Sequence, residues 1–172
     1  ISLVQNMACL PGMKEYPDKY FDILVADPPY GINFNMNAGQ RKGEKRRYKD
    51  KEWDNGIPCL EAFTEMFRVS KNQIIWGGNY FTEHLPPTKA WIFWDKHTPD
   101  GMSFADGELA WTSFNKTLVK VSLPYSGIVG REPSRFHPTQ KPVKLYEWLF
   151  RNYLTGGGEK ILDPFLGSGS SR

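Results

Sequence analysis

The sequence predicts an α/β domain built on a mostly parallel β-sheet, with an antiparallel segment late in the chain. Short apolar runs of strand length alternate with segments of helical periodicity, the order expected when helices connect the strands of one sheet. The central runs are rich in Val, Ile and Leu, which is typical of strands buried on both faces. With 172 residues the chain is long enough for one domain with a single core.

In the first half of the chain, the central strand is expected over 22–26, where four apolar residues precede a pair of prolines. The other elements expected there are a short strand over 1–4, a helical turn within 7–15, a helix over 58–69 and a strand over 73–76. The 58–69 helix has apolar residues at helical spacing. Pro58 suits its first position, with Asp54 or Asn55 as the candidate cap.

The second half is expected to supply the antiparallel segment and the last helix. Its expected elements, in order, are a short helix capped by Asn79, strands over 90–94, 108–114 and 117–121, a helix over 143–154 and a strand over 160–162. The turn residues Asn115 and Lys116 separate two of these strands. Two short strands joined by such a turn indicate a hairpin.

The central strand ends in the motif Asp27, Pro28, Pro29, Tyr30, around which the chain is organised. The carboxyl ends of strands are where open α/β sheets bind ligands. Two prolines restrict the backbone, so the Asp27 carboxylate and the Pro28 carbonyl are held stiffly beside the tyrosine ring. Two acceptors next to an aromatic ring suit an amino group on a flat heterocycle. The alternative is a strand-ending turn with a helix-capping Asp27.

A basic run follows this motif. Between Arg41 and Lys51, seven basic residues stand against two acidic ones, so the run carries +5 while the whole chain carries +3. The aromatic residues Tyr48 and Trp53 are interleaved with or follow the charges, which favours contact with nucleic-acid phosphates over a solvated charge run. The candidate DNA-binding residues are Arg41, Lys42, Lys45, Arg46, Arg47 and Lys49.

The last third of the chain carries a second group of motifs. A rigid polar turn over 137–142 opens the 143–154 helix, and Asp163 then leads from the last strand into a loop with two closely spaced glycines, Gly167 and Gly169. Such a loop lets a nucleotide-like ligand approach the backbone. The fingerprints of phosphate-binding and dinucleotide-binding loops do not match. An acidic residue at the loop's start suits a positively charged ligand better than phosphate.

Other classes of site find no support in the sequence. Cys9 and Cys59 are isolated, which argues against a zinc cluster or a disulfide framework and fits a reducing cytoplasm. The three histidines lack metal-ligand spacing, so no metal is expected. No apolar run approaches the roughly 18 residues of a membrane span, and no signal peptide is visible, so no membrane partner is expected.

Taken together, these motifs resemble those of the amino-group DNA methyltransferases, which use S-adenosylmethionine to methylate adenine N6 or cytosine N4. The 27–30 motif is similar to the family's catalytic motif, and 163–170 is similar to its methyl-donor loop. The 137–142 turn matches the motif that precedes the donor loop in the permuted, β-type members. Three further segments resemble family segments in family order: 74–79, 91–96 and 105–114.

The resemblance implies a Rossmann-like methyltransferase sheet that is circularly permuted and incomplete. It implies a single domain over 1–172, with a catalytic half over 1–135, a basic DNA-contact loop over 35–54 and a donor-binding portion over 136–172. Family members usually continue past the donor loop through a helix and a strand whose acidic end binds the donor's ribose, a portion absent from this sequence. Ala8 stands where members often have an acidic residue facing the donor's adenine. Weak donor binding is therefore expected.

The activity implied by the resemblance is methyl transfer from S-adenosylmethionine to N6 of an adenine flipped out of double-stranded DNA. The base would stack on Tyr30 and donate hydrogen bonds to Asp27 and to the Pro28 carbonyl. Adenine is favoured because members with Asp at this position mostly act on adenine. The residues implied to hold the donor are His137, Thr139, Lys141, Asp163, Phe165, Gly167, Ser168 and Gly169.

Alternatives stay open within this resemblance. They are a cytosine-N4 DNA methyltransferase, a methyltransferase of RNA or protein glutamine, and a DNA-binding relative that has lost catalysis. The +5 run favours nucleic acid over protein as the substrate. A cytoplasmic enzyme encoded by a bacterium or phage is implied, and a cognate restriction endonuclease is left open as a partner.

Overall fold

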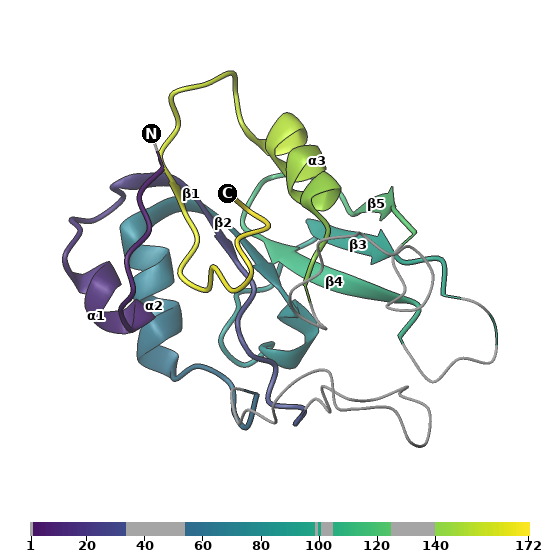
Figure 1. The fold of residues 1–172 in the computed structure, drawn as a ribbon, viewed down its shortest axis with the longest axis horizontal. Helices are drawn as coiled ribbons and strands as arrows, with labels where there is room; N and C mark the ends of the chain where they lie inside the picture. Colours follow the sequence, from purple (N-terminus) through teal and green to yellow (C-terminus); the bar gives the residue numbers. More distant parts are fainter. Residues whose placement is uncertain (1, 34–53, 99, 101–104, 125–139) are drawn as a thin grey trace.

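A computed structural model describes residues 2–33, 54–98, 100, 105–124 and 140–172, and in them one sheet has six strands in the order β5-β3-β4-β2-β1-β6 (Figure 1). The strands are β1 Phe21–Ala26, β2 Ser70–Trp76, β3 Trp91–Asp95, β4 Gly107–Thr112, β5 Val119–Ser122 and β6 Ile161–Leu162. The helices are α1 Cys9–Lys14, α2 Leu60–Val69, the 3-10 helix η1 Gly78–Tyr80 and α3 Val143–Tyr153.

Strand direction confirms the predicted fold class. β1 pairs in parallel with β2 and β6, and β3 pairs in parallel with β5. β4 lies between β2 and β3 and is antiparallel to both. Among the described strands, β4 is therefore the one that runs against the rest. Its first residues consequently lie at the edge where the other five strands end.

Alternate side chains of the central strands reach opposite faces, as expected for strands buried on both sides. Leu24 packs in a core cluster with residues of α1 and α2, whereas Val25 packs in a second cluster with residues of α3. Figure 1 shows the same layering, with α1 and α2 on one side of the sheet and α3 on the other. None of the helices in the described ranges is long and apolar enough to cross a membrane.

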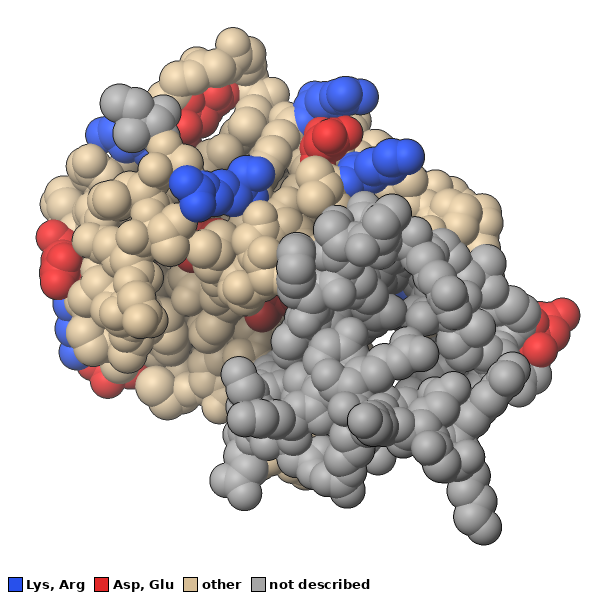
Figure 2. Space-filling model, in the orientation of Figure 1, with Lys and Arg blue, Asp and Glu red and all other residues tan. Residues whose placement is uncertain are grey.

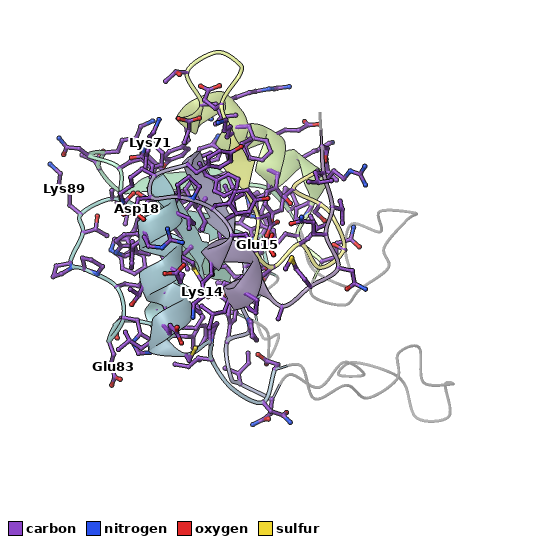
Figure 3. The ribbon with its side chains drawn as sticks, turned by 90° about the vertical axis from the view of Figure 1, so that its left-hand side faces the viewer. Lys14, Glu15, Asp18, Lys71, Glu83 and Lys89 are labelled. Atoms are coloured by element: carbon purple, nitrogen blue, oxygen red, sulfur yellow. The ribbon has the colours of Figure 1, made fainter. Side chains whose placement is uncertain are left out.

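One ion pair joins α1 to α2, and two others hold Arg68 of α2, on the side of the molecule that Figure 3 views. Lys14 Nζ lies 2.6 Å from Glu61 Oε1. Arg68 pairs with Glu65 at 2.7 Å and with Asp18, before β1, at 2.8 Å. These pairs lie on the α1 and α2 side, and their residues are not among those that form the site described below.

Two expected features of the sheet are wrong. Residues 2–4 form no strand, and Leu3 is 75% exposed, so this apolar stretch has no neighbour to pair with in the described part of the chain. The expected hairpin also does not form, because β5 pairs in parallel with β3 instead of antiparallel with β4. The Trp94 indole donates a hydrogen bond to the Leu123 carbonyl at 3.0 Å, which helps to hold the segment after β5 against β3.

The helix starts also differ from expectation. α2 begins at Leu60 with Cys59 as its N-cap, so neither Pro58 at a first position nor a cap by Asp54 is observed. The Asp54 side chain instead binds the turn after β1, as described below. Asn79 lies within the short 3-10 helix, whose N-cap is Gly77 in a left-handed conformation (φ 70°).

Candidate active site

The sequence-predicted acidic residues meet at one edge of the sheet. β1 and β6 are neighbours in register, with Leu24 opposite Leu162. Asp27 and Asp163 therefore follow two adjacent parallel strands at their carboxyl ends. Glu108 reaches the same edge from the start of the antiparallel strand β4. Open α/β sheets bind ligands at this edge, so the fold itself places these carboxylates where a ligand is expected.

The 27–30 turn is clamped by Asp54. One carboxylate oxygen of Asp54 accepts the backbone N–H of Tyr30 at 2.8 Å and that of Gly31 at 2.9 Å. Asp54 is 4% exposed, and Gly31 has a φ of 70° that a residue with a side chain would adopt only with strain. Two hydrogen bonds to a buried charge make this turn rigid. Asp54 is thus a support of the motif and not the helix cap that the sequence indicated.

The two oxygens of Asp27 have different surroundings. Oδ1 accepts a hydrogen bond from the Tyr30 hydroxyl at 2.8 Å and one from Lys141 Nζ at 2.5 Å. Within the described part of the chain, Oδ2 receives no hydrogen bond. The carboxylate is therefore anchored through one oxygen, and its second oxygen is left as an acceptor for a ligand.

The ring of Tyr30 lies in an aromatic setting at the same edge. It stacks on Tyr80 with centroids 5.0 Å apart and an interplanar angle of 16°, and it meets Phe81 edge-on. Gly77 packs directly against it, because a Cβ built on Gly77 would lie 2.3 Å from the ring. Any side chain at Gly77 would displace Tyr30, so a glycine at this position is what lets the ring pack there.

Lys141 lies among carboxylates and rings. Its side chain is 5% exposed, and Nζ is 2.5 Å from Asp27 and 3.1 Å from Glu108. Burial lowers the pKa of Lys141, but the two carboxylates outweigh burial and raise it overall. The resemblance assigned Lys141 to the donor site, whereas in the structure its ammonium contacts Asp27 and Tyr30 of the 27–30 turn.

For Glu108, the neighbouring charges lower the pKa, whereas for Lys141 they raise it. Burial raises its pKa, but Lys141 and Lys96 outweigh burial and hold the pKa at about 2. Lys96 forms an ion pair with Glu108 Oε1, and its Nζ lies 5.1 Å from the centroid of the Trp94 ring. The carboxylate of Glu108 is thus ionised at neutral pH.

Asp163 forms the other half of the site. Burial raises its pKa to about 6, and hydrogen bonds from Ser171 Oγ and from the Phe165 backbone N–H offset this only in part. Those bonds measure 2.5 Å and 2.9 Å, and both donors are neutral. Gly167 and Gly169 follow with φ of 53° and 80°, in the left-handed region. Within the described ranges, the Asp163 carboxyl is therefore half-buried beside a glycine turn without a cation in hydrogen-bond contact.

The remaining predicted site residues take varied positions. Ser168 lies in the same turn, where its hydroxyl is 3.1 Å from that of Ser170. Ala8 is exposed and precedes α1. His137, Thr139 and the six basic residues of the 41–49 run lie outside the described residues. In Figure 2 the described surface is mostly uncharged, with Lys and Arg side chains toward its upper part.

Sequence reasoning missed three supporting residues. Glu108 and Lys96 each stand at the end of an apolar strand, a signal that could have placed them at the site once the antiparallel direction of β4 was assumed. Asp54 gave no such signal, because 24 residues separate it from Tyr30. No group of three or more His, Cys, Asp or Glu that could hold a metal ion is found among the described residues.

Comparison with known proteins agrees with this geometry. No family model matches the chain. It is 26% identical over 182 residues to YubD of Escherichia coli (strain K12), which is assigned as a methylase, and covers 74% of that protein. It is 24% identical over 215 residues to the type II methyltransferase M.HinfI of Haemophilus influenzae, of which it spans 58%. Each match covers 95% of this chain.

Solved structures show the same architecture. TTHA0409 of Thermus thermophilus, assigned as a DNA modification methylase, superposes with a TM-score of 0.55 at 15% identity, over 96% of this chain and 80% of that one. The chain shares the fold of this structure. A second structure of TTHA0409, in complex with S-adenosyl-L-methionine, superposes with a TM-score of 0.52. The proteins that resemble this chain in sequence and those that resemble it in structure are thus all assigned as methylases or methyltransferases.

Proposed function

We propose that this chain is the catalytic part of a DNA methyltransferase that uses S-adenosylmethionine to methylate N6 of an adenine flipped out of double-stranded DNA. The observation that carries the proposal is Asp27, a carboxylate anchored through Oδ1 and, among the described contacts, open at Oδ2, beside the ring of Tyr30. It lies at the edge of a fold shared with DNA modification methylases.

The residues around Asp163 fit the methyl donor. S-adenosylmethionine carries a cationic ammonium and supplies a methyl group on a sulfonium sulfur. A half-buried carboxyl whose pKa is raised to about 6 gains most from a cationic partner, because the ligand's charge replaces the lost hydration. Nothing described lies within 4 Å of a Cβ built on Gly169, so the turn has open space beside it. We infer that Asp163, Phe165, Gly167, Ser168 and Gly169 hold the donor.

The catalytic role we assign to Asp27 is orientation of the target amine. Oδ2 would accept one amino hydrogen and the Pro28 carbonyl the other, which leaves the nitrogen lone pair free for the methyl group. The Tyr30 ring offers a stacking surface for the base. The nitrogen lone pair would form the new bond to the methyl carbon as the methyl–sulfur bond breaks, and the sulfonium sulfur would keep the bonding electrons as a neutral thioether. The amine would then lose one proton, and Asp27 Oδ2, which accepts a hydrogen bond from the amine in this arrangement, would take it. No covalent enzyme intermediate is required.

Adenine is favoured over cytosine through the Asp at position 27, and a basic run just after the site favours nucleic acid. Within this proposal the run contacts DNA phosphates, with His137 and Thr139 near the donor. A permuted order of motifs and an intracellular bacterial or phage enzyme follow from the same assignment. A cognate restriction endonuclease stays a candidate partner.

The test is transfer of labelled methyl from S-adenosylmethionine to duplex DNA, RNA and protein in parallel. The expected result is label in DNA, recovered as N6-methyladenine after digestion to nucleosides. Label recovered as N4-methylcytosine would refute the choice of base. Label only in RNA or in protein glutamine would refute DNA as the substrate. DNA binding without any transfer would identify a relative that has lost catalysis.

A further inference from the structure

The carboxylate of Glu108 holds the catalytic motif together from the far strand of the site. Oε2 lies 3.1 Å from Lys141 Nζ and 3.3 Å from the Tyr30 hydroxyl oxygen, whose single proton has its shorter contact with Asp27 Oδ1. Oε1 pairs with Lys96. One side chain therefore touches both partners of Asp27 Oδ1, although it does not touch Asp27 itself in any described contact.

The fold places Glu108 with little freedom. In the β3–β4 ladder Glu108 is opposite Trp94, and Gly107 is opposite Asp95. A Cβ built on Gly107 would lie 2.4 Å from the Trp94 carbonyl oxygen and 2.3 Å from the Phe93 ring. Only glycine lets the two strands approach so closely at this point. The pairing of β4 with β3 thus fixes the position of Glu108, the first side chain of β4, at the edge of the sheet where the site lies.

Glu108 gives the buried Lys141 ammonium a second carboxylate partner. Lys141 Nζ donates hydrogen bonds to Asp27 Oδ1 at 2.5 Å and to the Tyr30 hydroxyl oxygen at 3.1 Å, and it forms an ion pair with Glu108 Oε2 at 3.1 Å. Without the charge of Glu108, the buried cation would keep Asp27 as its one carboxylate partner in this cluster, and Nζ could turn toward Asp27 Oδ2.

The charges of the cluster balance in the same way. Asp27 and Glu108 contribute two negative charges, and Lys141 and Lys96 contribute two positive ones. A methylated amine carries positive charge before its proton leaves, so an uncompensated ammonium nearby would oppose transfer. The other titratable groups that interact with this cluster are Tyr30 after β1, Tyr146 of α3 and Asp163 after β6.

We propose that Glu108 is a positioning residue for methyl transfer, which acts through Lys141 and is itself balanced by Lys96. It keeps the lysine ammonium on Asp27 Oδ1, leaves Oδ2 to the substrate amine and cancels the charge that the lysine would otherwise bring. This inference rests on the proposed function, since it assigns a role within the same reaction.

The test compares Glu108→Gln with the protein as it stands in single-turnover methyl transfer. The amide keeps the size and one acceptor oxygen but removes the charge. We expect the rate to fall by about 10-fold to 100-fold, a range typical of outer hydrogen-bond partners of site residues, while the Kd for DNA changes little. Glu61→Gln, which removes a carboxylate from an exposed ion pair on α1 and α2, is the matched control and should leave the rate unchanged.

A charge-restoring variant separates positioning from folding. Lys96→Gln combined with Glu108→Gln brings the cluster back to zero net charge and should recover part of the missing rate. The second readout is the pKa of the Lys141 ammonium by nitrogen NMR, which should fall in Glu108→Gln because one of its two carboxylate partners is neutralised. This titration needs no activity.

The outcomes are distinguishable. If the protein methylates DNA and Glu108→Gln is equally fast with an unchanged Lys141 titration, the inference is overturned. A slow variant without recovery in the double variant, and with lowered melting temperature, would assign Glu108 to folding alone. If the unaltered protein transfers no methyl group to any substrate, the proposed function fails, and the Lys141 titration still decides whether Glu108 holds the lysine.

Discussion

Two carboxyl groups at one edge of the same sheet have opposite electrostatics. Glu108, on β4, contacts two lysines, which hold its pKa at about 2 although burial alone would raise it. Asp163, after β6, is half-buried like Glu108 but receives its described hydrogen bonds only from neutral donors, and partial burial raises its pKa to about 6. The difference lies in the partners, because burial acts in the same direction on both groups.

The region around Glu108 is preorganised, whereas the carboxyl of Asp163 has no cationic partner among its described hydrogen bonds. Around Glu108 and Asp27, the protein supplies its own cations, so the arrangement is complete before any ligand binds. Around Asp163, the protein leaves a half-buried acid that a cationic ligand would stabilise. We interpret the first region as the place where the substrate amine is oriented and the second as the place where the methyl donor binds.

The largest expected effect belongs to Asp27. By analogy with loss of one preorganised polar group in other active sites, Asp27→Ala should slow single-turnover transfer by roughly 100-fold to 1000-fold, about 2.7 to 4 kcal/mol, with little change in DNA affinity. Asp27→Asn should keep slightly more activity. A melting curve for each variant is the control. Loss of folding in Asp27→Ala would instead assign Asp27 a structural role through its contacts with Tyr30 and Lys141.

Asp163→Asn should act on the donor and leave DNA binding unchanged. Loss of a buried charge partner costs about 2 kcal/mol or more, so calorimetry should show donor affinity weakened at least about 30-fold.

The pKa of Asp163 in the folded protein lies above its ordinary value, so the ionised form disfavours folding, and the free energy of unfolding falls as pH rises from about 4 to about 6. The variant should therefore melt higher at neutral pH. An unaltered affinity would remove Asp163 from the donor site.

The pH dependence of donor binding follows from the same pKa. If the donor binds the ionised carboxylate, affinity should be complete well above about pH 6 and should decline as pH falls through that value. Asp163→Asn supplies the control, since its weak binding should not vary over this range. A flat profile in the unaltered protein would mean that Asp163 does not meet a cation.

Removal of the Tyr30 ring should have a smaller effect on base capture, in which stacking is the term measured, although it also removes the hydroxyl that donates to Asp27 Oδ1. Tyr30→Leu should weaken capture of an extrahelical base by about 1 to 3 kcal/mol, measured with a fluorescent base analogue at the target position. Tyr80→Leu is the matched variant, because Tyr80 stacks on Tyr30 but is 44% exposed. Equal capture by Tyr30→Leu and the unaltered protein would contradict a stacking role.

The smallest effect per residue is expected outside the two carboxyl regions, in the basic run. Neutralising Arg46 and Arg47 together should weaken binding to all DNA sequences alike. It should also flatten the salt dependence by up to about two units, near 0.9 for each phosphate that is no longer neutralised. Measuring binding at several salt concentrations gives the slope. An unchanged slope would assign the run to solvent.

The sequence predicted the sheet and its edge well, because strands buried on both faces have a strong apolar signature. The β1 run, the strand before Asp163 and the antiparallel segment were all placed within a few residues. It failed where pairing is decided by distant partners. β5 joins β3 instead of β4, and residues 2–4 pair with none of the described strands. Local turn residues cannot tell which strand edge is open.

The candidate site divides in the same way. Asp27, Tyr30 and Asp163 were visible because each sits in a motif next to its strand. Lys141 was identified but assigned to the donor, whereas its ammonium contacts Asp27. Glu108 became part of the site only through the direction of β4. Contacts between residues far apart in the chain depend on how the elements pack, and the local spacing of residues in the sequence does not show this packing.

The most direct test of the contrast between the two regions is a titration of side-chain carboxyl carbons by NMR, from about pH 4 to 8, with and without S-adenosylmethionine. The predicted result is that Glu108 stays ionised throughout, whereas Asp163 titrates near 6 and shifts downward when the donor binds. An Asp163 that titrates at its ordinary value and ignores the donor would contradict the account.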